Sequence, residues 1–144
     1  MGTVRPISDE WPLNDPKAQM ANKILIIDDD PALLLMMSYS LKKIGYDVSG
    51  GRDGQEAMKL MPQLMPDLTI IDVNLPLING DEVTKIFKKD EKLKSLKVIL
   101  MSALREGLSE KTEESGADGY FSKPFELSYL ISLAKKYCSE PPAN

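Results

Sequence analysis

Short apolar runs alternate with amphipathic stretches along most of the chain. Five runs have the length and the strand-favouring residues of β-strands, at 24–27, 46–49, 68–71, 98–102 and 118–122. Five stretches with apolar residues at helical spacing follow them, at 31–44, 54–61, 80–89, 106–115 and 125–137. Because strand and helix alternate, the pattern predicts an α/β fold with a parallel sheet that helices cover on both sides.

Turn-forming residues set the ends of several of these elements. Pro31 lies just inside the start of the first helix, and Gly45 closes that helix. Pro62 interrupts the second helical stretch, so we expect the second helix to break there. Gly50 and Gly51 come directly after the second strand, where they indicate a loose connection.

The two ends of the chain show neither pattern. Residues 1–21 contain prolines, acids and Trp11 without a helical or alternating period, which predicts an irregular extension. A short tail at 139–144 follows the last helix. The folded domain is therefore expected over 22–138, and a length of 144 residues suits one domain.

Composition and charge narrow the class of protein. Hydrophobic residues make up 42% and charged residues 28%, which is typical of a globular chain. No apolar run approaches the roughly 20 residues of a membrane span, and the start lacks the pattern of a signal peptide, so we expect a cytoplasmic protein. The net charge of −4 argues against nucleic-acid binding.

Residue content excludes several kinds of chemistry. The single cysteine, Cys138, can form neither an internal disulfide nor a thiolate zinc site. The chain has no histidine, which excludes serine–histidine and cysteine–histidine catalysis, imidazole metal sites and a phosphohistidine role. Carboxylates, hydroxyls and lysine must therefore carry the chemistry.

Such side chains gather at the carboxyl ends of the apolar runs. Asp28 and Asp29 follow the first run, Asp72 follows the third, Ser102 ends the fourth and Lys123 follows the fifth. Because the carboxyl ends of parallel strands share one edge of the sheet, we expect these side chains to converge. Carboxylates held together need a cation among them, and oxygen ligands alone point to magnesium.

A site of this kind suits phosphoryl transfer. An ionised aspartate can attack phosphorus without a general base, while a metal ion and Lys123 neutralise the phosphoryl oxygens. Ser102 can donate its hydroxyl to one of those oxygens. Asp30 fits a helix cap or first-turn acid better than a ligand.

The chain resembles a response regulator receiver domain, the phosphoacceptor half of two-component signalling. Five segments carry the resemblance: ILIIDDDP at 24–31, PDLTIIDVNLP at 66–76, NG at 79–80, VILMSA at 98–103 and GADGYFSKPF at 116–125. Their order and spacing are those of the family, over about residues 23–138. The resemblance implies a flavodoxin-like (βα)5 three-layer sandwich with strand order 2-1-3-4-5.

The resemblance implies that Asp72 is the phosphoacceptor. A histidine kinase or a histidine phosphotransfer domain would supply the phosphoryl group. Asp28, Asp29, Asp72 and the backbone carbonyl of Asn74 would hold Mg²⁺ or Mn²⁺, with Asp29 as the more direct ligand. Such a domain is not an enzyme with a separate substrate, because it catalyses only its own phosphorylation and dephosphorylation.

The resemblance also implies a switch. Ser102 would move toward the phosphoryl group that Lys123 binds, and Tyr120 would turn inward. The alternative for Tyr120 is an ordinary edge-strand aromatic. The Lys123-Pro124 bond is expected to be cis.

The output of this switch would be a protein contact. A downstream target is expected on the fourth helix, fifth strand and fifth helix, where the candidate residues are Leu104, Arg105, Leu108, Tyr120 and Ser122. We expect a monomer or a weak dimer without nucleic-acid or membrane partners.

The first helix has more apolar residues than one buried face can hold. Helical spacing places an inward stripe at Leu33, Met37, Leu41 and Ile44, so at least one residue among Leu34, Leu35 and Met36 should be partly exposed. In the family this helix docks the kinase or phosphotransfer domain, which an exposed Met and Leu surface suits. Cover by residues 1–21 is the alternative.

Two other functions remain open. A phosphate-independent interaction module can use the same fold, although the set of Asp28, Asp29, Asp72, Ser102 and Lys123 argues against it. A magnesium-dependent phosphatase of the haloacid dehalogenase type also forms an aspartyl phosphate. That family needs a cap or a general acid and usually a longer chain.

Overall fold

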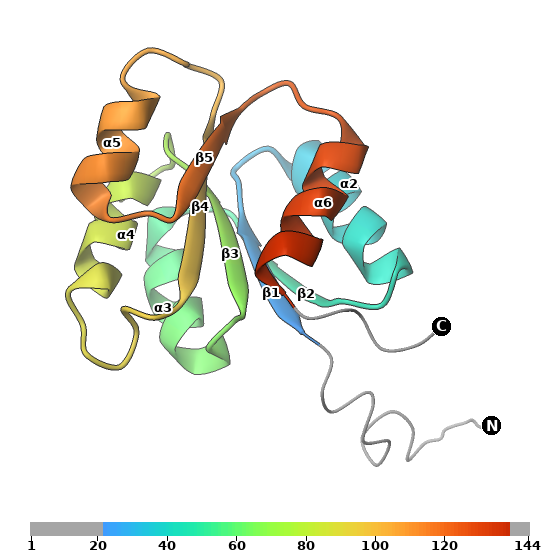
Figure 1. The fold of residues 1–144 in the computed structure, drawn as a ribbon, viewed down its shortest axis with the longest axis horizontal. Coiled ribbons are helices and arrows are strands. Elements are labelled where there is room, and N and C mark those ends of the chain that lie inside the picture. Colours follow the sequence, from blue (N-terminus) through green and yellow to red (C-terminus); the bar gives the residue numbers. More distant parts are fainter. Residues whose placement is uncertain (1–21, 139–144) are drawn as a thin grey trace.

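A five-stranded parallel sheet forms the centre of the computed structural model, which describes residues 22–138 (Figure 1). Its strands are β1 (Lys23–Ile27), β2 (Asp47–Gly51), β3 (Leu68–Asp72), β4 (Lys97–Ser102) and β5 (Gly119–Ser122). The helices are α2 (Pro31–Lys43), α3 (Gly54–Leu64), α4 (Gly80–Lys88), α5 (Leu108–Ser115) and α6 (Leu127–Tyr137). The strand order is β2-β1-β3-β4-β5, as expected.

Helices cover both faces of the sheet. Figure 1 shows α2 and α6 on one side and α3, α4 and α5 on the other. Alternate residues of each central strand supply two hydrophobic cores, so that Ile24 and Ile26 pack toward α2 and α6, whereas Leu25 and Ile27 pack toward α3 and α4. Strands buried on both faces explain the continuous apolar runs, and the arrangement is the expected three-layer sandwich.

The second strand is longer than the sequence pattern predicted. It continues through Gly50 and Gly51, which pair in register with Ile26 and Ile27 of β1. A Cβ on Gly50 would lie 3.0 Å from Leu34 Cδ1, and one on Gly51 would lie 2.9 Å from Ile27 Cδ1. The expectation of a loose connection was therefore wrong, because the two glycines make room for packed side chains.

The second helix, α3, also continues past the residue expected to break it. Pro62 lies inside α3, which ends at Leu64 with Met65 in the left-handed region at φ 48°. A proline near the end of a helix removes only one hydrogen bond, and the buried Ala57 and Met61 hold this helix on the sheet. Packing therefore outweighs the local preference for a break.

The first helix agrees with its expected cap and faces. Asp30 is its N-cap, and the carboxylate accepts hydrogen bonds from the backbone N–H groups of Ala32 and Leu33. Met37 and Leu41 are buried, whereas Leu35 is 71% exposed and Met36 is 43% exposed. The residues that could cover this surface from 1–21 lie outside the described part of the chain, as does the tail at 139–144.

None of the helices in residues 22–138 combines the length and the apolar character that crossing a membrane requires.

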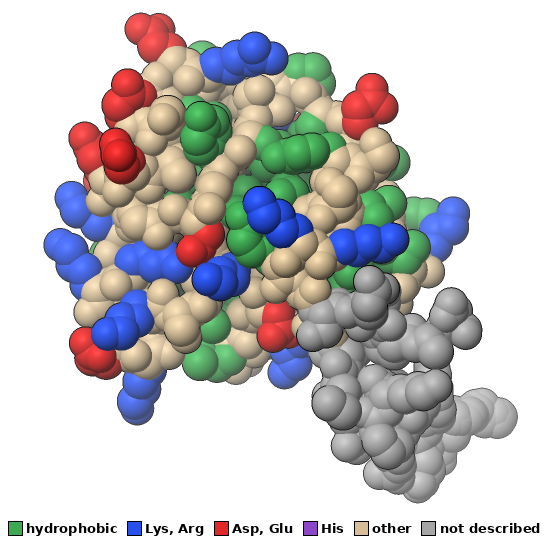
Figure 2. Space-filling model, in the orientation of Figure 1, with side chains coloured by type: hydrophobic (Ala, Val, Ile, Leu, Met, Phe, Trp, Pro, Cys, Tyr) green, Lys and Arg blue, Asp and Glu red, His purple; other side chains and the backbone are tan. Residues whose placement is uncertain are grey.

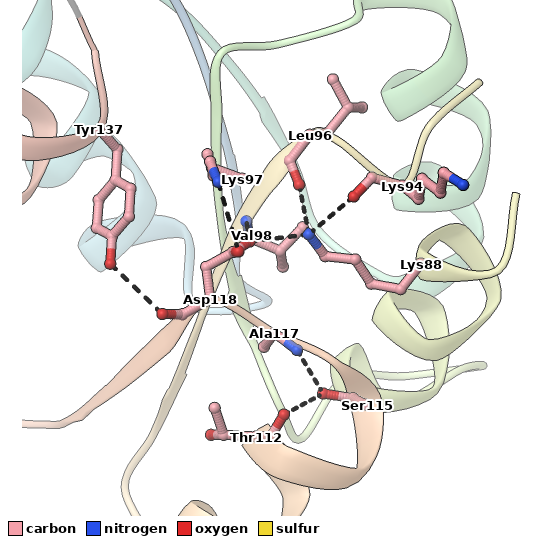
Figure 3. A network of polar contacts seen from close by, with 10 residues as sticks. All are labelled: Lys88, Lys94, Leu96, Lys97, Val98, Thr112, Ser115, Ala117, Asp118 and Tyr137. Atoms are coloured by element: carbon pink, nitrogen blue, oxygen red, sulfur yellow. Dashed lines mark hydrogen bonds and ion pairs between the residues drawn. The ribbon is translucent and has the colours of Figure 1, made fainter. Parts of the chain in front are cut away.

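A network around Lys88 and Asp118 fixes the amino-terminal edge of the sheet (Figure 3). Lys88 ends α4, and its Nζ donates to the carbonyl oxygens of Leu96 at 2.7 Å and Lys94 at 3.2 Å and to Asp118 Oδ2 at 2.9 Å. The same carboxylate accepts the N–H of Val98 in β4 at 2.9 Å. One ammonium group thus joins α4, the loop before β4 and the turn before β5.

We predict that Lys88→Met lowers the free energy of unfolding by about 2 kcal/mol, because two carbonyls and a carboxylate lose a charged donor. Lys94→Met is the matched control, since Lys94 is a 53% exposed side chain that pairs only with Glu91 in a surface contact at 2.9 Å. It should cost less than about 0.5 kcal/mol. Urea unfolding followed by circular dichroism measures both, and equal losses would contradict the structural role of Lys88.

Candidate functional site

Two buried carboxylates and one ammonium group form the centre of the site. Asp28 is fully buried at the end of β1, and Asp72 is 5% exposed at the end of β3. Lys123, which follows β5, places its Nζ 2.8 Å from Asp28 Oδ2 and 3.1 Å from Asp72 Oδ2. The strand order brings these groups together, because β1 and β3 are neighbours and all carboxyl ends lie at one edge.

A third carboxylate completes an acidic pocket. Asp28, Asp29 and Asp72 each offer one oxygen, and these atoms lie within 4.8 Å of one another. Asp29 is exposed, in contrast to the other two. A group of oxygen donors at this spacing, open to solvent on one side, can bind a hard divalent cation that keeps several waters.

Backbone hydrogen bonds hold the carboxylates in place. Asp28 donates its N–H to the Gly51 carbonyl at 3.1 Å, and Asp28 Oδ1 accepts the N–H of Asp30 at 2.9 Å. Asp72 Oδ1 accepts the N–H of Asn74 at 3.4 Å. Asn74 is itself exposed in the loop after β3. These contacts orient the acids while Asp29 stays open to solvent.

Gly80 permits the close approach of α4 to the Asp72 strand end. A Cβ at Gly80 would lie 2.1 Å from the Asp72 carbonyl oxygen, and the Gly80 N–H donates to the Val73 carbonyl at 2.8 Å. Only a residue without a side chain fits this contact. The glycine of the NG pair therefore seats the first turn of α4 directly on the site.

Ser102 and Lys123 come from neighbouring strand ends. Ser102 is 2% exposed, and its Oγ accepts the N–H of Leu104 at 3.0 Å. The Lys123 N–H donates to the Ser102 carbonyl at 2.9 Å, which continues the β4–β5 ladder past Ser122. The Lys123-Pro124 peptide bond is cis, as expected. Tyr120 lies further from the pocket on β5 and is 47% exposed.

Burial and charge shift the ionisation of the central pair. Burial raises the pKa of Asp72, and the nearby Asp28 carboxylate adds to this, although the contact with Lys123 opposes it. Burial alone would lower the pKa of Lys123, but its contacts with the Asp28 and Asp72 carboxylates raise it above the ordinary value. Lys123 therefore stays charged at neutral pH.

Comparison with known proteins identifies the family. The family model described as the response regulator receiver domain matches residues 24–135. The chain belongs to this family. The polar-differentiation response regulator DivK of Brucella ovis is 31% identical to this receiver domain over 122 residues, which are 84% of this chain and 99% of DivK.

A second relative is longer than this chain. The DNA-binding dual master transcriptional regulator RpaA of Synechocystis is 38% identical over 115 residues, which are 78% of this chain. The chain spans only 47% of the length of RpaA. The similarity therefore concerns less than half of RpaA.

Solved structures agree with the fold. The chemotaxis response regulator CheY4 of Vibrio cholerae has a TM-score of 0.76 at 26% identity, covering 82% of this chain and 99% of CheY4. The response regulator TrrA of Thermotoga maritima, in complex with Mg(2+)-BeF, has a TM-score of 0.73 at 31% identity, covering 81% of this chain and 99% of TrrA. The receiver domain has the CheY-like flavodoxin fold, with an acidic pocket typical of phosphoaccepting response regulators. Such domains are signalling phosphoacceptors that interact with histidine kinases, rather than enzymes in the usual sense.

Arg52 lies beside the pocket but was not among the residues selected from the sequence. Arg52 directly follows β2, and its Nη2 lies 3.5 Å from the Asp29 carbonyl oxygen. The expected strand order could have indicated it, because β2 is the neighbour of β1 and their carboxyl ends share an edge. The boundary of the second strand, placed too early, hid this proximity.

We predict that Gly80→Ala lowers the free energy of unfolding by about 3 kcal/mol, because its methyl group would overlap the Asp72 carbonyl. Gly107→Ala is the control. No atom lies within 4 Å of a Cβ added there, so the substitution introduces only the backbone strain of alanine at a φ of +77°. That strain costs about 1 kcal/mol. Urea unfolding gives both values, and amide NMR shifts should change at Asp72 and Val73 only for Gly80→Ala. Unchanged shifts there would contradict the contact.

Proposed function

We propose that Asp72 accepts a phosphoryl group from a histidine kinase or a histidine phosphotransfer protein, and that this change switches a protein-binding face. The observation that carries the proposal is the pocket itself, with three carboxylate oxygens within 4.8 Å of one another and Lys123 Nζ at 2.8 and 3.1 Å from two of the acids. Membership in the receiver family supports the same role.

The transfer uses groups that the pocket already holds. An oxygen of the ionised Asp72 carboxylate attacks phosphorus, and the bond from phosphorus to the donor nitrogen breaks with its electron pair on the imidazole, which takes a proton from solvent. Lys123 stays charged, and its ammonium group already contacts the Asp72 carboxylate. It can therefore form an ion pair with the phosphoryl oxygens when they are bound to Asp72. No other side chain has to remove a proton.

The donor set fits Mg²⁺ or Mn²⁺, because it consists of carboxylate oxygens without nitrogen or sulfur. Asp28, Asp29 and Asp72 would hold the ion together with the backbone carbonyl of Asn74. When bound, the ion supplies positive charge that offsets the charge of the phosphoryl oxygens. The TrrA structure in complex with Mg(2+)-BeF supports this assignment by similarity.

The proposed switch runs through Ser102 and Tyr120. The added charge on Asp72 attracts the Ser102 hydroxyl, and the space that Ser102 leaves lets Tyr120 turn inward from its exposed position on β5. Ser102 borders a small hollow beside the pocket, which gives it room to move; the hollow is lined by Val73, Asn74, Ser102, Leu104, Glu106, Leu108 and Lys111.

The face that responds is formed by α5, β5 and α6. Figure 2 shows hydrophobic side chains gathered between β5 and α6. Exposed members of this face include Leu104 at 64%, Tyr120 at 47% and Tyr129 at 42%. We propose that a downstream protein binds here, while the exposed Leu35 and Met36 of α2 meet the kinase or phosphotransfer domain. Both encounters would take place in the cytoplasm.

We predict that the wild type, treated with acetyl phosphate and Mg²⁺, gains the mass of one phosphoryl group, and that Asp72→Asn does not. The reason is that an amide cannot serve as the attacking oxygen. Intact-protein mass spectrometry measures both, and EDTA should abolish the gain.

Asp30→Asn is the matched control, because it removes an acid at the same edge while asparagine keeps the helix cap. This variant should be phosphorylated as the wild type is. An adduct that persists in Asp72→Asn would overturn the assignment of Asp72. No adduct on the wild type, either from acetyl phosphate or from a phosphorylated histidine kinase, would favour a phosphate-independent interaction module.

A further inference from the structure

Arg52 is a cationic residue that the β1–β2 ladder places beside the acidic pocket. Ile27 pairs with Gly51, the last residue of β2, and the Asp28 N–H extends the ladder by donating to the Gly51 carbonyl at 3.1 Å. Arg52 therefore follows β2 at the level where Asp28 and Asp29 follow β1. Its proximity to the pocket is set by the sheet and not by a flexible loop.

A hydrogen bond to the first turn of α3 holds the Arg52 backbone. The Arg52 N–H donates to the Glu56 carboxylate at 2.6 Å, and the Glu56 N–H donates in turn to the Asp53 carboxylate at 2.8 Å. The side chain reaches across to β1, where Nη2 lies 3.5 Å from the Asp29 carbonyl oxygen. The guanidinium group thus lies next to the backbone of Asp29, which is the most exposed of the three pocket acids.

Arg52 forms no ion pair with a carboxylate in the described part of the chain. Within residues 22–138, the ion pairs of the structure involve lysines 88, 94, 97 and 123 and no arginine. Arg52 is exposed, so an incoming ligand can meet its guanidinium group. This differs from Lys123, which is already engaged by two carboxylates.

A phosphoacceptor site binds a divalent cation and the phosphoryl group of a donor. An unpaired positive charge beside the site weakens the binding of the first and strengthens the binding of the second. It repels a divalent cation held by Asp28, Asp29 and Asp72, and it attracts the phosphoryl group of a donor, which carries about two negative charges near neutral pH. Guanidinium also matches the geometry of phosphoryl oxygens better than an ammonium group does.

We propose that Arg52 is a positioning residue that draws the phosphoryl group of the donor to the pocket, at the cost of weaker binding of the divalent cation. The inference rests on the proposed phosphorylation of Asp72. It adds to that function a second cation, on the β2 side of the pocket, opposite the Lys123 side.

The test measures two constants on the same variants. Isothermal titration calorimetry, without a phosphodonor, gives the dissociation constant for Mg²⁺. Mass spectrometry of samples quenched at successive times, at saturating Mg²⁺, gives the second-order rate constant for phosphorylation by acetyl phosphate. For Arg52→Ala we expect Mg²⁺ to bind roughly three- to tenfold more tightly and phosphorylation to slow by roughly three- to tenfold, the scale of one nearby exposed charge. Arg52→Glu should extend both changes.

Three controls separate charge from structure. Arg52→Lys keeps the charge, so both constants should stay within about twofold of the wild-type values. The loss of the guanidinium geometry accounts for any difference of that size. Lys92→Ala removes one positive charge from the exposed loop after α4, at the opposite edge of the sheet, and should change neither constant by more than about twofold. Added potassium chloride should shrink the differences seen for Arg52→Ala, because salt screens exposed charges.

Tighter Mg²⁺ binding together with slower phosphorylation in Arg52→Ala supports the inference. Weaker Mg²⁺ binding by Arg52→Ala, or equal effects of Arg52→Ala and Arg52→Lys, would overturn it and would assign Arg52 to holding the Asp29 backbone. A wild type that is phosphorylated on Asp72, with Arg52→Ala unchanged in both constants, would overturn this inference alone. A wild type that forms no adduct would overturn the proposed function, and the inference would fall with it.

Discussion

The contact of Lys123 with two buried carboxylates is the interaction on which the rest of the site depends. Asp28 and Asp72 are almost completely removed from water, and two negative charges that close repel each other strongly in a protein interior. The ammonium group of Lys123, at 2.8 and 3.1 Å, is the counter-charge that makes their burial tolerable. Because the three residues lie at the carboxyl ends of β1, β3 and β5, this neutralisation requires the sheet from β1 to β5 to be formed first. Assembly of the site is therefore a consequence of folding and not of any one loop.

The two edges of the sheet are chemically different, and helix geometry explains why. Helices that connect parallel strands begin at the carboxyl edge, where the caps Asp30 and Asp53 accept backbone N–H groups. They end at the opposite edge, where α2, α4 and α6 carry lysines in their last turns. Figure 2 shows Lys and Arg side chains gathered on the lower part of the molecule, where α4 ends. Lys88 fixes α4, β4 and β5 to one another at this edge, and β4 and β5 carry Ser102 and Lys123 at the other.

The alternation of buried strands and helices was sufficient to predict a parallel sheet and the convergence of Asp28, Asp72 and Lys123 at one edge of it. The strand order followed from the resemblance to receiver domains. Prediction from the sequence failed where tertiary packing decides. Pro62 lies inside α3 because buried neighbours hold that helix, and Gly50 belongs to β2 because Leu34 fills the space beside it. Local preferences of proline and glycine predict the opposite in both cases. The exposure of Asp29, in contrast to the burial of Asp28, also could not be read from two adjacent identical residues.

A hydrogen bond at the end of β4 shows how a change at Asp72 can reach the surface. The Ser102 hydroxyl accepts the N–H of Leu104 and can donate its own hydrogen to a phosphoryl oxygen. Under the proposed function, a movement of Ser102 toward Asp72 must therefore either break this bond or carry the Leu104 backbone with it. Leu104 is 64% exposed and lies in the loop between β4 and α5, so either outcome alters the apolar surface that it contributes to the α5, β5 and α6 face. A buried hydroxyl with a single backbone partner is thus enough to couple added charge in the pocket to the shape of the α5, β5 and α6 face, without any rearrangement of the sheet.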